Sequence, residues 1–374
     1  MLRTGRVLRF APVGAKRVPL ARSTAARMPL AFLNSVEKGN CMKEKAARNR
    51  TIDFTIEEGR EYLDRCMRAD AVSGTVASVV NQFIIGDCME VMDKMPRRFV
   101  DLLVADPPYN LAKDYHGNQF NKKSREDYRA YTIAWLEKAI PLLKKTASIY
   151  VCCDWRSSLV IGDVLYHYFK VRNRITWQRE KGRGALTNWK NGMEDIWFAT
   201  VSNEYTFNLE DVKIRKKVIA PYKVEGKPKD WEETEGGNFR NTCPSNFWDD
   251  ISIPYWSMPE NTAHPAQKPE KLIAKLILAS SREGDIVFDP FAGSGTTAVT
   301  AKKLRRRFVC VEQNERYGAW AQKRLEMAEA DPSIQGYQNG VFWERNTLTE
   351  QRKALNRAKE NSACACAEKK HPSR

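Results

Sequence analysis

Strand-like and helix-like patterns alternate along residues 82–329, and this alternation limits the possible fold more than any other feature of the chain. Short apolar runs are separated by longer segments in which apolar residues recur every three or four positions. This order is typical of an α/β fold with a mostly parallel sheet and helices on both faces. The predicted strands are 82–86, 99–105, 148–153, 174–178, 196–201, 285–289 and 308–312. The predicted helices are 56–68, 89–95, 125–145, 158–169, 270–280, 296–304 and 314–329.

Residues 202–262 lack this alternation and read as an insertion. With 374 residues, the chain is long enough for one large α/β domain with insertions, or for two domains. We therefore expect a basic tail, a helical extension, two halves of the α/β region around the insertion, and a C-terminal tail. The expected ranges are 1–50 for the basic tail, 51–80 for the helical extension, 81–201 and 263–330 for the two halves of the α/β region, and 331–374 for the C-terminal tail.

Positive charge is in excess, with 62 Lys and Arg against 46 Asp and Glu, and the formal charge of +16 fits a polyanionic partner. Seven of the positive charges lie in residues 1–36, which contain no acid. We interpret this segment as a disordered tail with Met28 or Met42 as the initiator; a transit-like or DNA-binding arm is the alternative. The remaining net charge still favours a polyanion.

The nine cysteines include no C-x-x-C pair, and the four histidines form no H-E-x-x-H motif. We interpret the cysteines as reduced thiols of a cytosolic protein, and we predict no metal site. Cys364 and Cys366 form a C-x-C pair near the end of the chain, which we interpret as incidental rather than as a metal or redox pair. The chain has no run of 18 apolar residues, so we predict no transmembrane helix.

The first turn that predicts chemistry is Asp106-Pro107-Pro108-Tyr109, directly after the apolar run 99–105. The two prolines fix the backbone and remove two N–H donors, so the carbonyls of the turn can act as outward acceptors. A carboxylate precedes them and a phenol ring follows. An exocyclic amine of a nucleobase needs two acceptors for its hydrogens and a flat surface for its ring. The alternative is a turn that only ends a strand, with Tyr109 as a packing residue.

The second turn is the glycine-rich sequence FDPFAGSGTT at 288–297, between a predicted strand and a predicted helix. Glycines allow a tight turn and close approach of a ligand, and the helix start offers free N–H groups. Glu312 ends the next strand, where an acid can accept both hydroxyls of a ribose. This turn alone predicts an adenosine-type cofactor, either a nicotinamide or S-adenosylmethionine. Its candidate binding residues are Asp289, Phe291, Gly293, Gly295 and Thr296.

Together the two turns resemble those of the DNA amino-methyltransferases, in which DPPY is the catalytic signature and F-x-G-x-G the cofactor signature. DPPY precedes FAGSG here, and this permuted order resembles the β class of bacterial DNA methyltransferases. The resemblance covers residues 83–329, about two thirds of the chain. It implies a Rossmann-like S-adenosylmethionine-dependent methyltransferase fold with an inserted target-recognition region at 202–262.

The resemblance implies roles for the catalytic turn. Asp106 would orient the target amine, Pro107 would supply a carbonyl acceptor within the rigid Pro107-Pro108 pair, and Tyr109 would stack on a base flipped out of the duplex. The methyl group would pass directly from the sulfonium to the amine, without a metal or covalent enzyme intermediate. DPPY favours adenine N6 over cytosine N4. The chain has Cys243-Pro244 but no Pro-Cys dipeptide, so we reject methylation of cytosine C5.

Two further motifs resemble cofactor-binding segments of the same family. Gly86-Asp87-Cys88 looks like its GDC turn, in which Asp87 would contact the cofactor adenine. The sequence HPAQKP at 264–269 looks like its HPTQKP segment, with Ala266 in place of Thr, and Gln267 and Lys268 would help to enclose the methionine end. Each of these residues has an alternative interpretation, as a helix cap or an ordinary surface residue.

A basic stretch at 170–190 holds seven Lys or Arg and one acid, with two tryptophans and two glycines interleaved. This composition suits contact with DNA phosphates, and a solvated strand pair is the alternative. The insertion 202–262 has eight Lys or Arg and eleven Asp or Glu, so we expect it to read base edges instead. The candidate DNA-binding residues are Arg174, Arg179, Lys181, Arg183 and Lys190.

The function predicted from the sequence is therefore site-specific methylation of adenine N6 in DNA, with S-adenosylmethionine as cofactor. The alternatives are a cytosine N4 or RNA amino-methyltransferase, a nicotinamide-dependent oxidoreductase that uses only the glycine-rich turn, and a DNA-binding module without activity. Double-stranded DNA is the predicted partner. A cognate restriction endonuclease and a homodimer are further partners that the resemblance allows.

Overall fold

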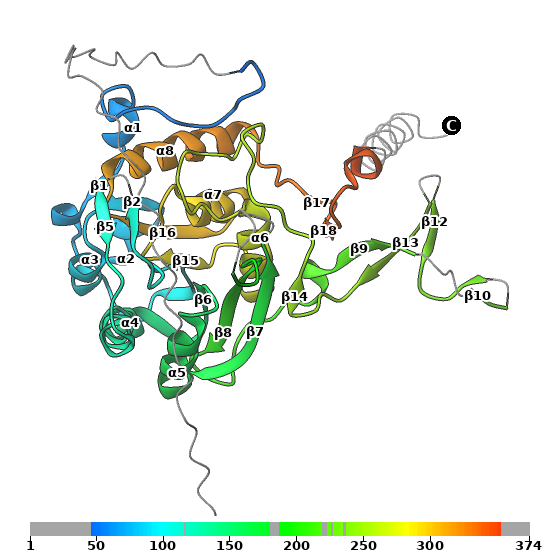
Figure 1. The fold of residues 1–374 in the computed structure, drawn as a ribbon, viewed down its shortest axis with the longest axis horizontal. Coiled ribbons are helices and arrows are strands. Elements are labelled where there is room, and N and C mark those ends of the chain that lie inside the picture. The colour runs from blue at the N-terminus through cyan, green and yellow to red at the C-terminus, as the bar shows by residue number, and fades with distance from the viewer. Residues whose placement is uncertain are drawn as a thin grey trace, which may run out of the picture. The chain divides into compact units, whose positions relative to one another are not determined.

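The computed structural model describes residues 46–352, apart from 116, 180–186, 219–222, 226 and 235–236. Its centre is a nine-stranded sheet of order β1-β2-β16-β15-β3-β6-β8-β7-β14 (Figure 1). All neighbouring pairs are parallel except those of β8, which runs antiparallel to both β6 and β7. The strands are β1 Met67–Arg68, β2 Gln82–Ile85, β3 Val100–Ala105, β6 Leu143–Cys153, β7 Lys170–Gln178, β8 Met193–Thr200, β14 Phe247–Trp248, β15 Ile286–Asp289 and β16 Arg307–Glu312.

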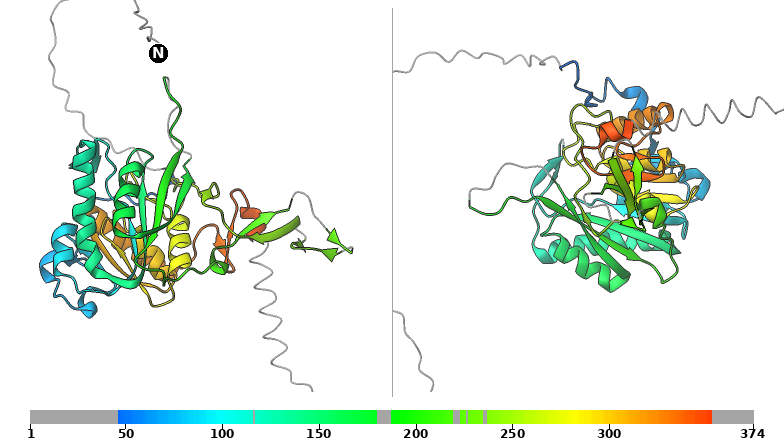
Figure 2. Two further views of the ribbon diagram at one scale, coloured as in Figure 1. Left: turned by 90° about the horizontal axis from the view of Figure 1, so that it is seen from below. Right: turned by 90° about the vertical axis from the view of Figure 1, so that its right-hand side faces the viewer.

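Both faces of this sheet are buried, as the predicted fold requires. Alternate residues of β3 point to opposite faces, with Leu102 and Val104 in one hydrophobic cluster and Leu103 and Ala105 in the other. The first cluster packs against α6 Glu270–Ser280, α7 Thr296–Lys303 and α8 Glu315–Ala330. The second packs against α3 Cys88–Lys94, α4 Arg125–Ala139 and α5 Ser158–Tyr168. Figure 2 shows the two helix layers on either side of the strands.

The structure corrects two predicted helices. Only α1, Arg60–Leu63, is α-helical within 56–68, because Met67–Arg68 pairs with the end of β2 as an added edge strand. The helix predicted to reach residue 145 ends at Ala139, and a 3-10 turn, η2 Ile140–Leu142, follows it. Pro141 has no N–H for a helical hydrogen bond, and the chain enters β6 directly after this turn. Two short one-turn elements, α2 Val76–Val79 and η1 Ala69–Ala71, lie before β2.

The insertion forms most of a second sheet, of order β12-β13-β9-β18-β17. Its strands are β9 Ile214–Lys217, β12 Glu232–Thr234, β13 Gly237–Thr242, β17 Tyr337–Gln338 and β18 Val341–Trp343. The last two strands come from the range expected to be the C-terminal tail. Phe342 and Trp343 are buried, and Phe342 packs with Ala274 and Leu278 of α6 and with Ile214. This burial explains why a polar-looking terminal segment is part of the folded structure.

The other described elements are short. The hairpins are β4 Lys113–Tyr115 with β5 Asn118–Phe120, and β10 Lys223–Val224 with β11 Lys227–Pro228, and the 3-10 turn η3 Glu210–Val212 precedes β9. Six cysteines lie in the described ranges, and all carry free thiols. Cys364 and Cys366 lie outside those ranges, as do Met28 and Met42. Within the part of the chain that the structure describes, no helix is long and apolar enough to cross a membrane.

Candidate active site

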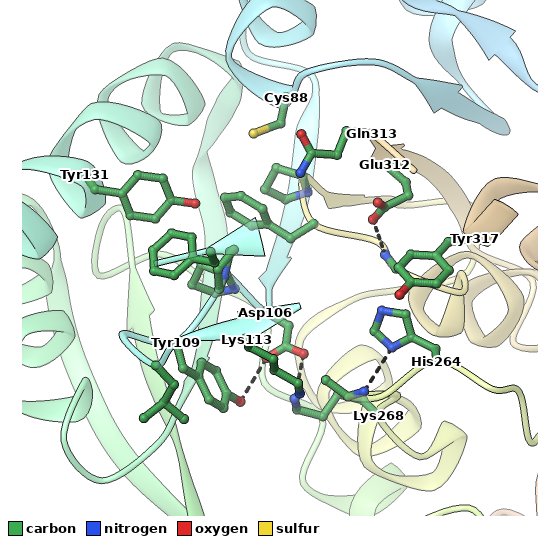
Figure 3. Close-up of a pocket in the computed structure, with 18 of the residues that line it drawn as sticks. Cys88, Asp106, Tyr109, Lys113, Tyr131, His264, Lys268, Glu312, Gln313 and Tyr317 are labelled. Carbon is green, nitrogen blue, oxygen red and sulfur yellow. Dashed lines mark hydrogen bonds and ion pairs between the residues drawn. The ribbon is translucent and has the colours of Figure 1, made fainter. Parts of the chain in front are cut away.

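The two motif turns meet around one cavity of about 320 Å³ at the carboxyl ends of the parallel strands (Figure 3). Tyr109 follows β3 and Phe291 follows β15, and both line the cavity although about 180 residues separate them in the sequence. A cavity of this size lies within the range of small-molecule sites. The residues predicted from the sequence that line it are Asp87, Asp106, Pro107, Pro108, Tyr109, Arg179, Lys268, Phe291, Gly293 and Glu312.

Asp106 lies where β3 ends, and each of its carboxylate oxygens accepts a hydrogen bond. The Tyr109 hydroxyl donates to Oδ1 at 2.9 Å, and the Lys268 ammonium lies 2.6 Å from Oδ2. The neighbouring Pro108 carbonyl accepts from the Tyr128 hydroxyl of α4 at 3.1 Å. The turn is therefore fixed on the helix side, and it directs a carboxylate and a phenol ring into the cavity.

A second carboxylate, Glu194 at the start of β8, lies close to the same groups. Its Oε2 is 3.1 Å from the Tyr109 hydroxyl and 3.4 Å from Lys268 Nζ, and its Oε1 pairs with the Arg179 guanidinium. Burial alone would raise the pKa of Glu194, but Lys268 and Arg179 hold that pKa below its usual value. Burial would likewise lower the pKa of Lys268, but Asp106 and Glu194 raise it above the ordinary value. The site therefore holds two acids paired with two cations.

The glycine-rich turn forms the opposite wall. Gly293 has a φ of +53°, and a Cβ at this position would lie 3.0 Å from His264 Nε2. Its N–H donates to Glu312 Oε2 at 2.8 Å, and Asn314 N–H donates to Oε1 at 2.9 Å. Burial raises the pKa of Glu312 to about 6, although these backbone donors oppose the shift. A carboxylate is thereby fixed at the end of β16, on the cavity wall.

Two predicted cofactor residues, Asp289 and Thr296, lie behind this wall in the structure. Asp289 accepts from the Thr297 hydroxyl at 2.5 Å and from Phe291 N–H at 2.9 Å, and burial raises its pKa to about 7. The Thr296 hydroxyl donates to the Lys268 carbonyl at 3.0 Å. These bonds hold the turn and the Lys268 segment together.

The predicted cofactor residues Gln267 and Gly295 also make their contacts within the protein. Gln267 accepts from Thr262 N–H at 2.8 Å and donates to the Glu260 carbonyl at 2.7 Å, which ties its loop together. Gly295 caps α7 with a φ of +79°, where a Cβ would lie 2.5 Å from Ala321 Cβ. Asp87 caps α3 by accepting from Met89 N–H at 2.7 Å, and it also lines the cavity. Asp87 therefore both caps α3 and lines the cavity.

The predicted DNA-binding residues do not all face solvent. Arg179 pairs with the buried Glu194 inside the cavity, whereas Arg174 is half-exposed and lies 3.9 Å from Asp195. Lys190 is exposed beside Trp189, whose side chain is 94% exposed. Lys181 and Arg183 lie outside the described residues. In the insertion, Trp248 is buried, and its indole N–H donates to the Ser245 carbonyl at 3.0 Å.

Sequence reasoning missed several side chains of the cavity. Glu194 lies before the predicted strand 196–201 but inside the observed β8, and the sequence pattern does not give the direction of that strand. Because β8 is antiparallel to β6, its start lies at the same edge as the ends of the parallel strands. The only sequence signal for Glu194 was that the segment forming β8 contains both acidic and apolar residues. Other lining side chains come from helices, loops and the β5 strand, and they are Cys88, Phe120, Tyr131, His264, Gln313 and Tyr317. Cys88 and His264 lie in motifs named above, where no role was assigned to them. Figure 3 shows Cys88, Tyr131, His264, Gln313 and Tyr317 around the cavity.

Comparison with known proteins gives consistent likenesses. A family model described as DNA methylase matches residues 100–323. The chain is 31% identical to the type II methyltransferase M.HpaI of Haemophilus parainfluenzae, over 66% of this chain and 74% of that protein. It is 32% identical to the DNA adenine methyltransferase YhdJ of Escherichia coli K12, over 66% of this chain and 82% of that protein. Among solved structures, the M1.HpyAVI complex with SAM is 24% identical with a TM-score of 0.45, over 65% of this chain and 98% of that one.

Proposed function

Because the chain belongs to the N6/N4 DNA methylase family, we propose that its cavity transfers a methyl group from S-adenosylmethionine to N6 of adenine in DNA. One observation carries this proposal: the Asp106 turn and the Gly293–Glu312 wall face the same cavity. A cofactor held by one wall would present its reactive group to an amine held by the other. The matching DNA adenine methyltransferase YhdJ supports adenine as the base.

The cavity residues fit S-adenosylmethionine. The close approach of Gly293 and His264 leaves room for a ligand only because no Cβ is present there. Glu312 can accept the ribose hydroxyls and Asp87 can accept from the adenine amine. When bound, the cofactor supplies an electrophilic methyl group on sulfur.

The chain's own residues supply alignment and hydrogen bonding. Asp106 and the Pro107 carbonyl accept both amine hydrogens of the base, which favours a pyramidal nitrogen with its lone pair available. The Tyr109 ring supports the flipped base, and its hydroxyl fixes the ring through Asp106 and Glu194. After transfer, the amine nitrogen carries a positive charge, and an Asp106 oxygen is placed to accept its proton. The buried walls exclude water from the reacting groups.

Double-stranded DNA is the proposed partner, with its target base flipped out to reach the cavity. Lys190 and the half-exposed Arg174 are proposed phosphate contacts. We also retain as proposals a homodimer, a cognate restriction endonuclease and a location in the cytoplasm of a bacterial-type cell. Sedimentation of the purified protein with and without DNA tests the first of these.

The experiment that tests the function uses purified protein, tritiated S-adenosylmethionine and DNA from a methylation-free host. After digestion to nucleosides, the label should appear in N6-methyldeoxyadenosine. Label in N4-methyldeoxycytidine would assign the cytosine reaction instead. Absence of label from DNA, with label in RNA supplied in parallel, would contradict the proposal.

A further inference from the structure

Two carboxylates in the active site share the same two donors. The Tyr109 hydroxyl is 2.9 Å from Asp106 Oδ1 and 3.1 Å from Glu194 Oε2. The Lys268 ammonium is 2.6 Å from Asp106 Oδ2 and 3.4 Å from the same Glu194 oxygen. Figure 3 shows Tyr109 and Lys268 converging on Asp106. Glu194 Oε2 is therefore an alternative acceptor for both groups.

The donors cannot serve both acids equally. A phenol carries a single hydrogen, so the Tyr109 hydroxyl donates to one carboxylate at a time. Lys268 has three hydrogens but lies closer to Asp106. Each oxygen of Asp106 thus already accepts one strong donor. An amine that enters the cavity must compete with these donors for the carboxylate that should orient it.

The Glu194 carboxylate is buried, so it accepts hydrogen bonds from the protein rather than from solvent. Its side chain is 5% exposed, and Arg179 holds Oε1 in place. A buried carboxylate is costly unless it is paired, and this one lies on β8, an interior strand of the sheet, at the strand end where the cavity opens. Its Oε2 therefore stays within reach of Tyr109 and Lys268 while Arg179 balances its charge.

We propose that Glu194 is a positioning residue: its Oε2 takes the Tyr109 hydroxyl and the Lys268 ammonium when the target amine binds, so that Asp106 becomes free to accept the amine hydrogens. The change exchanges hydrogen bonds only, and the charges of the site stay constant. This inference rests on the proposed function, and it adds a residue that acts through Asp106 without touching the substrate.

The test compares Glu194→Gln, Tyr109→Phe and the double variant in single-turnover methyl transfer from tritiated S-adenosylmethionine to DNA from a methylation-free host. Gln cannot balance the Lys268 and Arg179 charges, so Glu194→Gln should lower the rate by about tenfold to a hundredfold. Binding of S-adenosylmethionine should be unchanged. Tyr109→Phe keeps the ring but removes the hydroxyl, and its own loss of rate supplies the second arm of the cycle.

The double variant gives the decisive comparison. Removing the hydroxyl that Glu194 should receive frees Asp106 Oδ1, so the double variant should be faster than Glu194→Gln alone. A merely structural role predicts that the two losses multiply instead. Asp195→Asn is the matched control on the same strand: Asp195 is 2% exposed and accepts from the Thr176 hydroxyl at 2.9 Å, and this variant should keep the parent rate.

Each outcome decides the question. A Glu194→Gln protein at the parent rate, or losses that multiply in the double variant, overturns the inference, and an inactive Asp106→Ala protein beside it leaves the proposed function standing. If Glu194→Gln does not fold, Glu194→Asp replaces it, because the shorter side chain keeps the charge but withdraws the acceptor. Rescue of Glu194→Asp by Tyr109→Phe supports the role, and its absence rejects it. A parent protein without transfer activity removes both proposals.

Discussion

At the scale of single residues, the proposed reaction depends most on Asp106. Replacing Asp106 with Ala would remove the proposed acceptor for the target amine and leave the Gly293–Glu312 wall intact. We expect methyl transfer to fall by a factor of about 1,000 or more, since both orientation and an acceptor are lost. Calorimetry should show that S-adenosylmethionine still binds. An Asp106→Ala protein with parent activity would contradict the role of Asp106.

Glu312 predicts how cofactor affinity depends on pH. Its pKa in the unliganded protein is raised to about 6 by burial, and a ribose that donates two hydroxyls favours the ionised form. Affinity for S-adenosylmethionine should therefore be constant above about pH 7 and fall as the pH drops through 6. Calorimetric titration between pH 5 and pH 8 measures this dependence. Glu312→Gln should bind more weakly at pH 8 and show no such fall, and an identical fall in both proteins would exclude Glu312 as its source.

Residues differ in how far the sequence could predict them. Asp106, Tyr109 and Gly293 lie in compact motifs whose spacing places them at the ends of strands, and the structure brings them together. Glu194 could not be found in this way, because its position depends on the direction of β8. Gln267 and Asp289 lie in the predicted motif segments, but their side chains accept hydrogen bonds from N–H groups of the protein's own loops.

At the scale of elements, the start of α7 depends on Gly295. Replacing Gly295 with Ala adds a Cβ 2.5 Å from Ala321 Cβ of α8 at a φ of +79°. We expect a loss of about 2–4 kcal/mol in unfolding free energy, from backbone strain and overpacking together. Urea denaturation followed by tryptophan fluorescence measures it.

Gly284 is the matched control for this change. It has a φ of +81°, but a Cβ there would meet no atom within 4 Å. Gly284→Ala should therefore cost only the backbone strain, about 1–2 kcal/mol. Equal losses in the two variants would mean that α8 accommodates the added Cβ at the α7 start without cost.

Elements with strong local patterns were predictable, and those set by pairing were not. The α6, α7 and α8 helices and the strands β2, β3, β15 and β16 agree with the sequence pattern to within a residue or so, whereas β6 and β7 begin several residues earlier than predicted. The short β1 strand exists because β2 offers an unpaired edge, and β18 exists because β9 does. Such partners lie far away in sequence, so local periodicity carries no information about them.

At the scale of the whole chain, a buried charge cluster joins the second sheet to the catalytic sheet through α6. Asp250 Oδ1 and Oδ2 each lie 2.7 Å from an ammonium, that of Lys275 and that of Lys271, and Lys271 also donates to the Trp343 carbonyl at 2.5 Å. Asp250→Asn leaves these ammonium groups without their counter-charge. We expect a loss of about 3–5 kcal/mol in unfolding free energy, measured by urea denaturation.

The matched control for this cluster is Glu329→Gln, which breaks the ion pair between Glu329 and Lys302. The Lys302 side chain is 34% exposed and the Glu329 side chain is 66% exposed. Solvent screens that pair, so the loss should stay below about 1 kcal/mol. If Asp250→Asn were as stable as Glu329→Gln, the buried cluster would not hold the second sheet to α6.

The most direct test of the central claim is single-molecule sequencing of DNA from a methylation-free host that expresses this chain. It reports the modified base, the atom and the surrounding sequence together. If Asp106 and the Gly293–Glu312 wall form one methyl-transfer site, N6-methyladenine should appear within a defined motif and disappear with Asp106→Ala. Unmodified DNA in cells with abundant folded protein, or modification that persists in Asp106→Ala, would contradict the account.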